Sequence, residues 1–450
     1  MTAQLSPKKI RVVAIGAGSV GFGRGIITGL MASKALKDRD LTLSLVDKDK
    51  VALDVVAQFA ELVKKHYGSH VTIETSTDRE QALKGANYVV NAVARRRMEL
   101  WAEDFFVPAA FGFPQALGEN GGPGGAFHTL RSIHLILPVC KDIERICPQA
   151  HLINYSNPQS RVSLAISKCT AVSMVGLCHG PFETLDKVAE IMKRPAESIE
   201  IDLGGINHFH WMLKISDRQN DRDLYPQFHN EMQKTNVRLD PLTRRLYETF
   251  GLFPIPSGGH TSEYVSFGYN LLGPTWLWGV GKNRDLYLKE NPNEGRRTYY
   301  TVTLESLRNV ISGREPLTPN LVQPPTSDIA VPIICDIELD RKQRELAVNI
   351  PNQGLAIANL PEDAIVEVPA MVDARGIHPI PVGPLPNAIA AMCHLQISIQ
   401  QLLVEAYQKK SRKILLQALL LDPLVNDADK AEKMMNELLR VEADYLPELQ

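Results

Sequence analysis

The first part of the chain alternates short apolar runs with longer amphipathic segments, the pattern of buried strands separated by helices. The runs are rich in β-branched residues and too short to be helices of a compact domain. The pattern predicts strands at residues 9–15, 41–47, 71–76 and 87–93, with helices at about 24–35, 50–66 and 78–84. Buried strands that alternate with helices predict an α/β fold with a doubly wound parallel sheet.

The later part of the chain is less regular. Residues 111–126 are rich in Gly and Pro and predict a functional loop, while two Pro-rich stretches, 314–332 and 376–387, interrupt the second half. Further strands are predicted at 151–156 and 171–177, a strand-turn-strand unit near 200–215, and helices at about 127–146, 387–408, 412–420 and 426–443. We divide the chain into an N-terminal domain, 1–195, and a second domain, 196–450.

A glycine motif joins the first strand to the first helix. Gly16, Gly18 and Gly21 form G-x-G-x-x-G, with Ser19 inside the motif. Glycine lets the backbone turn tightly and approach a pyrophosphate, and the positive end of the following helix attracts that charge. The motif, between a strand and a helix, predicts a Rossmann domain that binds a dinucleotide.

An acidic residue, Asp47, ends the second predicted strand and is placed to bind the hydroxyls of the adenosine ribose. It lies 31 residues after Gly16, against about 20 in the usual motif, and a longer first helix would account for the difference. An acid at this position favours NAD over NADP, although Lys48 and Lys50 keep NADP open.

The composition is that of a globular protein and excludes several partners. With 49 basic and 51 acidic residues the net charge is −2, so neither nucleic acid nor an anionic membrane is an expected partner. We find no apolar run long enough to span a membrane and no hydrophobic signal core, and expect a cytoplasmic protein. The six cysteines are sparse and show no paired spacing, so most are expected to be buried hydrophobes.

Polar clusters follow the predicted strands, where ligands bind in open α/β sheets. A Cys and a His from separate strand ends could share one divalent ion, although by pattern alone such a pair more often packs and hydrogen-bonds. The clusters are Asn154-Tyr-Ser-Asn157, Cys178-His179, Asn207-His208-Phe-His210 and, in a Gly-rich loop, Gly259-His260-Thr-Ser-Glu263-Tyr264.

Taken together, the motifs resemble glycoside hydrolase family 4, the NAD- and Mn-dependent glycosidases. Their order and spacing cover nearly the whole chain. The matching pieces are Ile15–Ser19, Asn154–Pro158, Gly176–Gly180, Gly205–Phe209, Gly259–Tyr264, Gly383–Pro386 and Val404–Ala406. The resemblance implies a Rossmann domain followed by an α+β domain like that of lactate and malate dehydrogenases.

The resemblance also implies an unusual chemistry, because this family is an NAD-dependent exception among glycosidases. In the family, NAD oxidises C3 of the sugar, a base removes the acidified C2 proton, and the aglycone leaves by elimination. Water then adds back and the hydride returns to C3, so NAD is regenerated. Mn²⁺ or another divalent metal stabilises the charge on the C2 and C3 oxygens.

Carried over by position, the resemblance assigns four residues. Cys178 and His208 match the metal ligands, and Asn157 matches a residue that contacts the sugar hydroxyls. His179 stands where the family places the group that assists departure of the aglycone. His210 is expected to be structural.

Two positions depart from the family pattern. The acid or tyrosine that often accompanies the base is missing around Gly259-His260, so the C2 base stays open between His260, Tyr264 and a metal-bound hydroxide. The loop acid is also displaced, because Gln115 is followed by Ala116, and its role is either lost or moved to Glu119.

The residues after the cysteine indicate the sugar. Cys178-His179-Gly180 resembles the α-glucuronidase subgroup, and Arg95 and Arg97 are candidates to bind a uronate carboxylate. The predicted function is therefore hydrolysis of an α-glucuronide or α-galacturonide. Alternatives are a neutral-sugar α-galactosidase or α-glucosidase, a malate-type dehydrogenase, and a non-catalytic NAD-sensing protein. The resemblance implies a homodimer or homotetramer.

Overall fold

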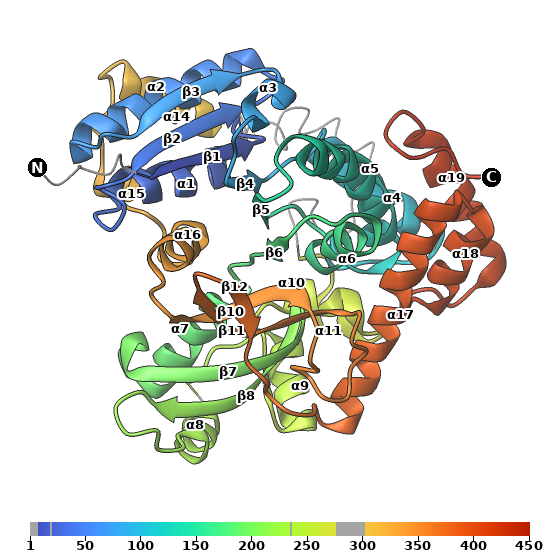
Figure 1. The fold of residues 1–450 in the computed structure, drawn as a ribbon. Coiled ribbons are helices and arrows are strands. Elements are labelled where there is room, and N and C mark those ends of the chain that lie inside the picture. Colours follow the sequence, from blue (N-terminus) through green and yellow to red (C-terminus); the bar gives the residue numbers. More distant parts are fainter. Residues whose placement is uncertain (1–7, 19, 235, 276–301) are drawn as a thin grey trace, which may run out of the picture.

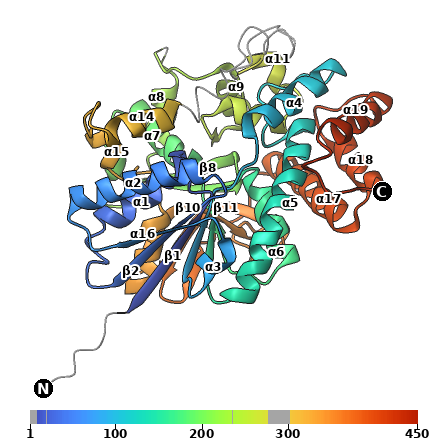
Figure 2. The same cartoon turned by 90° about the horizontal axis from the view of Figure 1, so that it is seen from above.

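The computed structural model describes residues 8–18, 20–234, 236–275 and 302–450. These residues form one twelve-stranded sheet with the strand order β3-β2-β1-β4-β5-β6-β10-β11-β7-β8-β9, and β12 pairs with β11. Helices cover both faces of its first half, and a cluster of C-terminal helices packs at one side (Figures 1 and 2).

The first six strands are parallel, which confirms the predicted doubly wound sheet. Because their carboxyl ends share one edge, this edge collects the loops that carry the predicted cofactor and metal residues. The strands are β1 (Lys9–Ile15), β2 (Asp40–Val46), β3 (Thr72–Ser76), β4 (Tyr88–Asn91), β5 (His151–Asn154) and β6 (Met174–Gly176).

Alternation of side chains along β1 builds two separate cores. Val12 and Ala14 join a core with α1 and α2, while Val13 and Ile15 join one with α3, α5 and α6. The helices of the first face are α1 (Val20–Ala32), α2 (Lys50–Tyr67), α14 (Val302–Ile311), α15 (Pro319–Val322) and α16 (Ala330–Leu339); those of the second are α3 (Arg79–Leu83), α5 (Gly122–Ile146) and α6 (Gln159–Cys169).

The sheet continues into an antiparallel half through a single junction, where Gly176 of β6 pairs with Asn349 of β10. The predicted strand-turn-strand unit is the hairpin β7–β8. The strands of this half are β7 (Ile199–Ile206), β8 (Phe209–Asp217), β9 (Phe253–Pro254), β10 (Gln343–Pro351), β11 (Ile365–Asp373) and β12 (Gly376–Pro379). The proposed domain boundary near residue 195 stays a prediction.

The remaining helices lie around the carboxyl edge and beside α4, α5 and α6 (Figure 2). The C-terminal helices are tied to α4 and α5 by a buried ion-pair cluster in which Arg131 binds both Asp104 and Glu442. These helices are α4 (Arg97–Ala110), α7 (Gly180–Met192), η1 (Ala196–Ser198), α8 (Tyr225–Met232), α9 (Pro241–Phe250), α10 (Gly258–Thr261), η2 (Ser262–Tyr264), α11 (Gly268–Leu272), α17 (Asn387–Lys409), α18 (Arg412–Leu421) and α19 (Ala428–Val441).

The predicted loop 111–126 was wrong at its end, because α5 already begins at Gly122. Glycine is required there by close packing rather than by loop flexibility, because a Cβ on Gly124 would lie 2.4 Å from the carbonyl oxygen of Asp104 in α4. The first helix likewise begins at Val20 instead of 24. No described helix is long and apolar enough to cross a bilayer.

Candidate active site

The glycine motif forms a tight turn at the carboxyl edge of the sheet. Gly16 has a φ of +82°, and a Cβ there would lie 2.8 Å from the carbonyl oxygen of Ala92 after β4. A Cβ on Gly18 would lie 2.8 Å from Asp47 Oδ2. Side chains are therefore excluded from a cradle between β1, β2 and β4, as the pyrophosphate of a dinucleotide requires. Gly21 lies in the first turn of α1, and Ser19 lies outside the described residues.

Asp47 is fixed at the end of β2 by two backbone groups. Its Oδ2 accepts a hydrogen bond from Gly18 N at 2.8 Å, and its Oδ1 accepts one from Asp49 N at 2.9 Å. Each carboxylate oxygen has two lone pairs, so both can still accept from a ribose hydroxyl. The cradle and this acid together fit the adenosine end of NAD.

We expect Gly18→Ala to lower NAD affinity by about tenfold or more, because the new Cβ would displace the Asp47 carboxylate and with it about 1.5–3 kcal/mol of charged hydrogen bonding. Isothermal titration with NAD measures the effect. The thermal unfolding curve is the control, and a variant that unfolds at a lower temperature but binds NAD with unchanged affinity would contradict the prediction.

Cys178 and His208 meet at the same edge. Cys178 follows β6, and His208 lies in the turn between β7 and β8 with a φ of +61°. The distance from Cys178 Sγ to His208 Nε2 is 3.2 Å, and Gly180 N donates to the sulfur at 3.4 Å. The two predicted metal ligands, 30 residues apart in sequence, are thus adjacent in space.

The protonation of the pair follows from burial. Burial raises the pKa of the Cys178 thiol to about 12, with help from the charge of Glu367. Burial, with the neighbouring rings of His260 and His210, holds the pKa of His208 well below its usual range. The neutral imidazole is the ligating form of histidine, whereas the thiol would give up its proton on binding a metal.

The donor set fits a metal that shares its ligands with a substrate. Among the described residues no group of three or more His, Cys, Asp or Glu side chains could hold a metal ion. A pair of protein ligands leaves several coordination positions open, the arrangement of a catalytic rather than a structural site. His208 Nδ1 is buried and has no hydrogen-bond partner in the described structure.

The buried carboxylate of Glu367 in β11 supports the turn that carries His208. Its Oε1 accepts from Asn207 Nδ2 at 2.9 Å and from Asn349 Nδ2 at 2.8 Å, and its Oε2 lies 2.6 Å from His210 Nδ1. His210 Nε2 lies 2.9 Å from Thr184 Oγ1 in α7. This network ties β8, β10, β11 and α7 together, with His210 inside it rather than in a cavity.

The Cys178–His208 pair faces a cavity of about 450 Å³ at the carboxyl edge. Most of the predicted substrate and catalytic residues line it, although they come from different elements. These lining residues include Arg97, Glu119, Asn157, His179 and His260. The cavity is therefore the candidate site for the sugar.

His260 and Tyr264 have different positions. The His260 ring stacks on His208 with 4.0 Å between centroids, and its Nδ1 lies 3.6 Å from Glu263 Oε2. Burial alone would lower the pKa of His260, but the nearby Glu263 carboxylate and the charges of Glu119 and Glu183 outweigh it and raise this pKa. Tyr264 does not line the cavity; its hydroxyl donates to the backbone oxygen of Asn207 at 3.3 Å.

A catalytic role of Tyr264 stays a prediction, and this position favours His260 over Tyr264 as the group that reaches the sugar. The Tyr264 side chain is 5% exposed, and burial holds its pKa well above the ordinary value of a phenol. As positioned, Tyr264 supports the turn that presents His208.

Glu119, left open by the sequence, lies in the cavity wall and is 3% exposed. Its Oε1 accepts from Arg97 Nη2 at 2.5 Å, and its Oε2 accepts from Asn120 Nδ2 at 3.3 Å. Burial would raise the pKa of Glu119, but the charges of Arg97, His260 and His128 and a hydrogen bond from Asn157 outweigh it and lower this pKa. Glu119 is thus a carboxylate between the arginine and the predicted sugar contact.

The two candidate arginines line a common cavity, but only Arg97 also lines the sugar cavity. Arg97 lines the 450 Å³ cavity and lies over the Trp101 ring at 5.3 Å, whereas Arg95 lines a second cavity and lies over Tyr445 at 5.1 Å. Arg97 is therefore the better placed of the two candidates for a sugar carboxylate, and binding of the sugar by Arg95 stays a prediction.

Sequence patterns missed the carboxylates that hold the site. Glu263 Oε1 accepts from the backbone N of both Glu119 and Asn120, and so fixes the loop that carries them. Glu263 was visible only as part of a motif, and Glu367 had no local signal, since it lies inside an apolar strand far from any other site residue.

Two sequence models match the chain. The one described as Family 4 glycosyl hydrolase matches residues 11–194, and the one described as Family 4 glycosyl hydrolase C-terminal domain matches residues 203–425.

Similar characterised proteins extend over almost the whole chain. An alpha-glucosidase of Erwinia rhapontici is 29% identical over 97% of this chain and 98% of its own length. An alpha-galactosidase of Bacillus subtilis is 28% identical over 97% and 99%, and an alpha-galacturonidase of the same species is 26% identical over 96% and 97%.

Solved structures share the fold. A 6-phospho-alpha-glucosidase from gut microorganisms, crystallised with NAD and Mn²⁺, superposes with a TM-score of 0.82 at 22% identity, covering 98% of this chain and 100% of its own. A lactate dehydrogenase from a deep-sea metagenome library of the Medee basin superposes with a TM-score of 0.53 at 13% identity, covering 89% and 99%. The predicted Rossmann sheet with a dehydrogenase-like second part is thereby confirmed.

Proposed function

The chain belongs to glycoside hydrolase family 4, and we propose that it hydrolyses α-glycosides with NAD and a divalent metal ion, such as Mn²⁺, as cofactors. The observation that carries this proposal is the Cys178–His208 pair, 3.2 Å apart, facing a 450 Å³ cavity on the edge of the sheet that also holds the glycine cradle. A dehydrogenase of malate type needs an active-site histidine but no thiol beside it.

Both cofactors fit the residues present. The Gly16–Gly18 turn and Asp47 would hold NAD, and Cys178 and His208 would hold the metal, with open positions for sugar oxygens. When bound, NAD supplies reversible hydride transfer and the metal supplies a Lewis acid.

The chain itself supplies the groups that move protons. His179 lines the cavity next to Cys178 and is our candidate to protonate the departing aglycone. His260 lines it beside His208, with Glu263 and Asn120 orienting its Nδ1, and is our candidate to remove the proton from C2 of the sugar. Asn157, held against Glu119, is placed to bind a sugar hydroxyl.

A screen of p-nitrophenyl α-glycosides with and without NAD and Mn²⁺ tests the proposal. We expect hydrolysis that needs both additions and no net formation of NADH. Net NADH formation would favour the malate-type dehydrogenase, and NAD binding without any turnover would favour a sensing protein. Assembly as a dimer or tetramer and a cytoplasmic location stay predictions.

We further propose a uronide, an α-glucuronide or α-galacturonide, as the first candidate substrate. Cys178-His179-Gly180 resembles the α-glucuronidase subgroup, and the guanidinium of Arg97 lines the sugar cavity. A guanidinium carries five N–H donors in a planar fork that matches a carboxylate. The α-galacturonidase relative is consistent with this choice.

A neutral sugar is the second candidate, favoured by the ion pair between Arg97 and Glu119. Glu119 already compensates the charge of the arginine, and Glu183 adds a second carboxylate to the cavity wall. A further carboxylate, on the sugar, would meet repulsion there. The α-glucosidase and α-galactosidase relatives agree with a neutral sugar.

Glu119→Gln is expected to shift the preference toward the uronide by about tenfold, because it removes a negative charge that repels the substrate carboxylate and that neutralises Arg97. The ratio of KM values for a uronide and its neutral counterpart measures this shift independently of kcat. Glu183→Gln, which removes a cavity charge but keeps the Arg97–Glu119 ion pair, is the matched control. An unchanged ratio in Glu119→Gln would contradict the prediction.

A further inference from the structure

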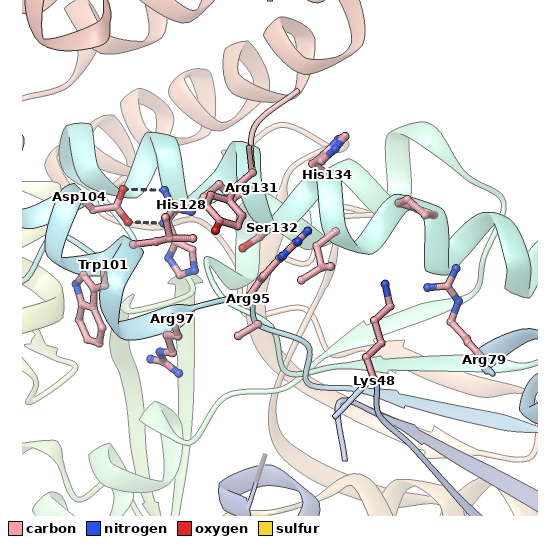
Figure 3. Close-up of a pocket in the computed structure, with 15 residues that line it drawn as sticks. Lys48, Arg79, Arg95, Arg97, Trp101, Asp104, His128, Arg131, Ser132 and His134 are labelled. Carbon is pink, nitrogen blue, oxygen red and sulfur yellow. Dashed lines mark hydrogen bonds and ion pairs between the residues drawn. The ribbon is translucent and has the colours of Figure 1, made fainter. Parts of the chain in front are cut away.

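A second cavity, of about 280 Å³, adjoins the sugar cavity and is shown in Figure 3. Arg97 and Trp101 line both cavities. Lys48 and Arg79, which follow β2 and β3, lie at one end of the second cavity. The Arg131–Asp104 pair lies at the other end. Apart from Arg97, the proposed hydrolysis assigns no role to the residues of this cavity.

Its positive charge is only partly compensated. Three of its cations pair with carboxylates: Arg79 with Asp142, Arg97 with Glu119, and Arg131 with Asp104 and Glu442. Lys48 and Arg95 form no ion pair with any described carboxylate, and the only contact found for Arg95 in that part of the chain is with the uncharged ring of Tyr445. A concave surface with two uncompensated cations attracts an anion.

The cavity begins beside the dinucleotide cradle. Lys48 follows Asp47 directly, and Ala94, Leu135 and Pro138 give the cavity an apolar wall suited to a flat ring. In this fold the residue that ends the second strand faces the adenosine ribose, and a cation nearby can accommodate a phosphate on its 2′ oxygen. Asp47 does not line this cavity, because the N–H groups of Gly18 and Asp49 hold its carboxylate at the glycine turn, whereas Lys48 does line it.

We propose that the Lys48 end of this cavity binds a phosphomonoester carried on the adenosine ribose, so that the protein accepts NADP as well as NAD. The inference rests on the dinucleotide site of the proposed function. Use of NADP is compatible with the proposed hydrolysis. The dinucleotide is regenerated in each turnover, so the reaction does not depend on whether the cell keeps its NAD or its NADP mainly oxidised or reduced. The ammonium of Lys48 would pair with the phosphate dianion, with Arg79 and Arg95 adding to the field.

Isothermal titration of the full chain with NAD⁺ and NADP⁺ tests the proposal. We expect NADP⁺ to bind at least as tightly as NAD⁺, and Lys48→Ala to lower the NADP⁺/NAD⁺ affinity ratio about tenfold, the effect of one charge-assisted hydrogen bond. Lys48→Arg should restore the ratio. Lys50→Ala is the matched control, because Lys50 is an exposed lysine two residues away that does not line the cavity.

Two outcomes would overturn the proposal. The first is wild-type protein that binds NADP⁺ at least tenfold more weakly than NAD⁺. The second is an equal change of the ratio in Lys48→Ala and Lys50→Ala. Inorganic phosphate, titrated alone, separates the two sources of the group: saturable phosphate binding that depends on Lys48, together with weak NADP⁺ binding, would assign the site to a free phosphate compound and overturn the assignment to the dinucleotide.

These results are independent of hydrolysis. NADP⁺ binding without turnover of any glycoside would leave this inference standing and refute the proposed function. Hydrolysis supported by NAD⁺ but not by NADP⁺ would support the proposed function and refute this inference.

Discussion

Cys178→Ser is expected to lower kcat/KM for glycoside hydrolysis by about 10³-fold or more. Within the part of the chain that the structure describes, Cys178 and His208 are the two groups that we assign to the metal, and a hydroxyl is a far weaker ligand than a thiolate. Lewis-acid stabilisation of a developing oxyanion supplies several kcal/mol, and each 1.4 kcal/mol is about a tenfold change in rate. Turnover of the best p-nitrophenyl glycoside at saturating NAD and Mn²⁺ measures the loss.

Binding of Mn²⁺, followed by electron paramagnetic resonance, shows whether the lost activity comes from a lost metal. Cys169→Ser is the matched control: Cys169 is also partly exposed, but its sulfur accepts a hydrogen bond from Gln408 far from the cavity. We expect it to retain both activity and metal. Full activity in Cys178→Ser, or equal losses in the two variants, would contradict the assignment.

Glu367→Ala is expected to lower the free energy of unfolding by roughly 3–5 kcal/mol, among the largest effects of a single substitution. Glu367 is fully buried and is the shared partner of Asn207, Asn349 and His210. Each buried donor left without a partner costs about 1–3 kcal/mol. Because the network holds the turn that carries His208, metal affinity should fall as well.

Urea unfolding followed by circular dichroism measures the change. Glu367→Gln is the informative companion, since its amide oxygen can still accept from both asparagines and only the contact with His210 becomes unfavourable. We expect a smaller loss of stability in this variant. If Glu367→Ala unfolds at the wild-type urea concentration, the network does not support the His208 turn as we describe.

The parallel half of the sheet was predictable from the sequence because its signals are local. Short apolar runs, the glycine turn after Ile15 and the acid at Asp47 each depend on neighbours in the chain. The end of the predicted loop at Gly122 failed for a physical reason: glycines that allow close packing against α4 look, in sequence, like glycines that allow flexibility.

The proximity of Cys178 and His208 was predictable only because each follows a strand and matches a family motif. The site around them depends on contacts between distant segments, which no local pattern encodes. Glu367 reaches His210 from a strand 157 residues further along the chain. Arg95 and Arg97 looked equivalent in sequence, yet both line the 280 Å³ cavity and only Arg97 also lines the sugar cavity.

The most direct test of the account is hydrolysis of an α-glycoside in D₂O, with the product sugar examined by NMR. If a base in the cavity removes the C2 proton, the sugar should carry deuterium at C2, the reaction should stop when NAD or the divalent metal is withheld, and NADH should not accumulate. Hydrolysis that continues without NAD and leaves C2 fully protonated would contradict the account.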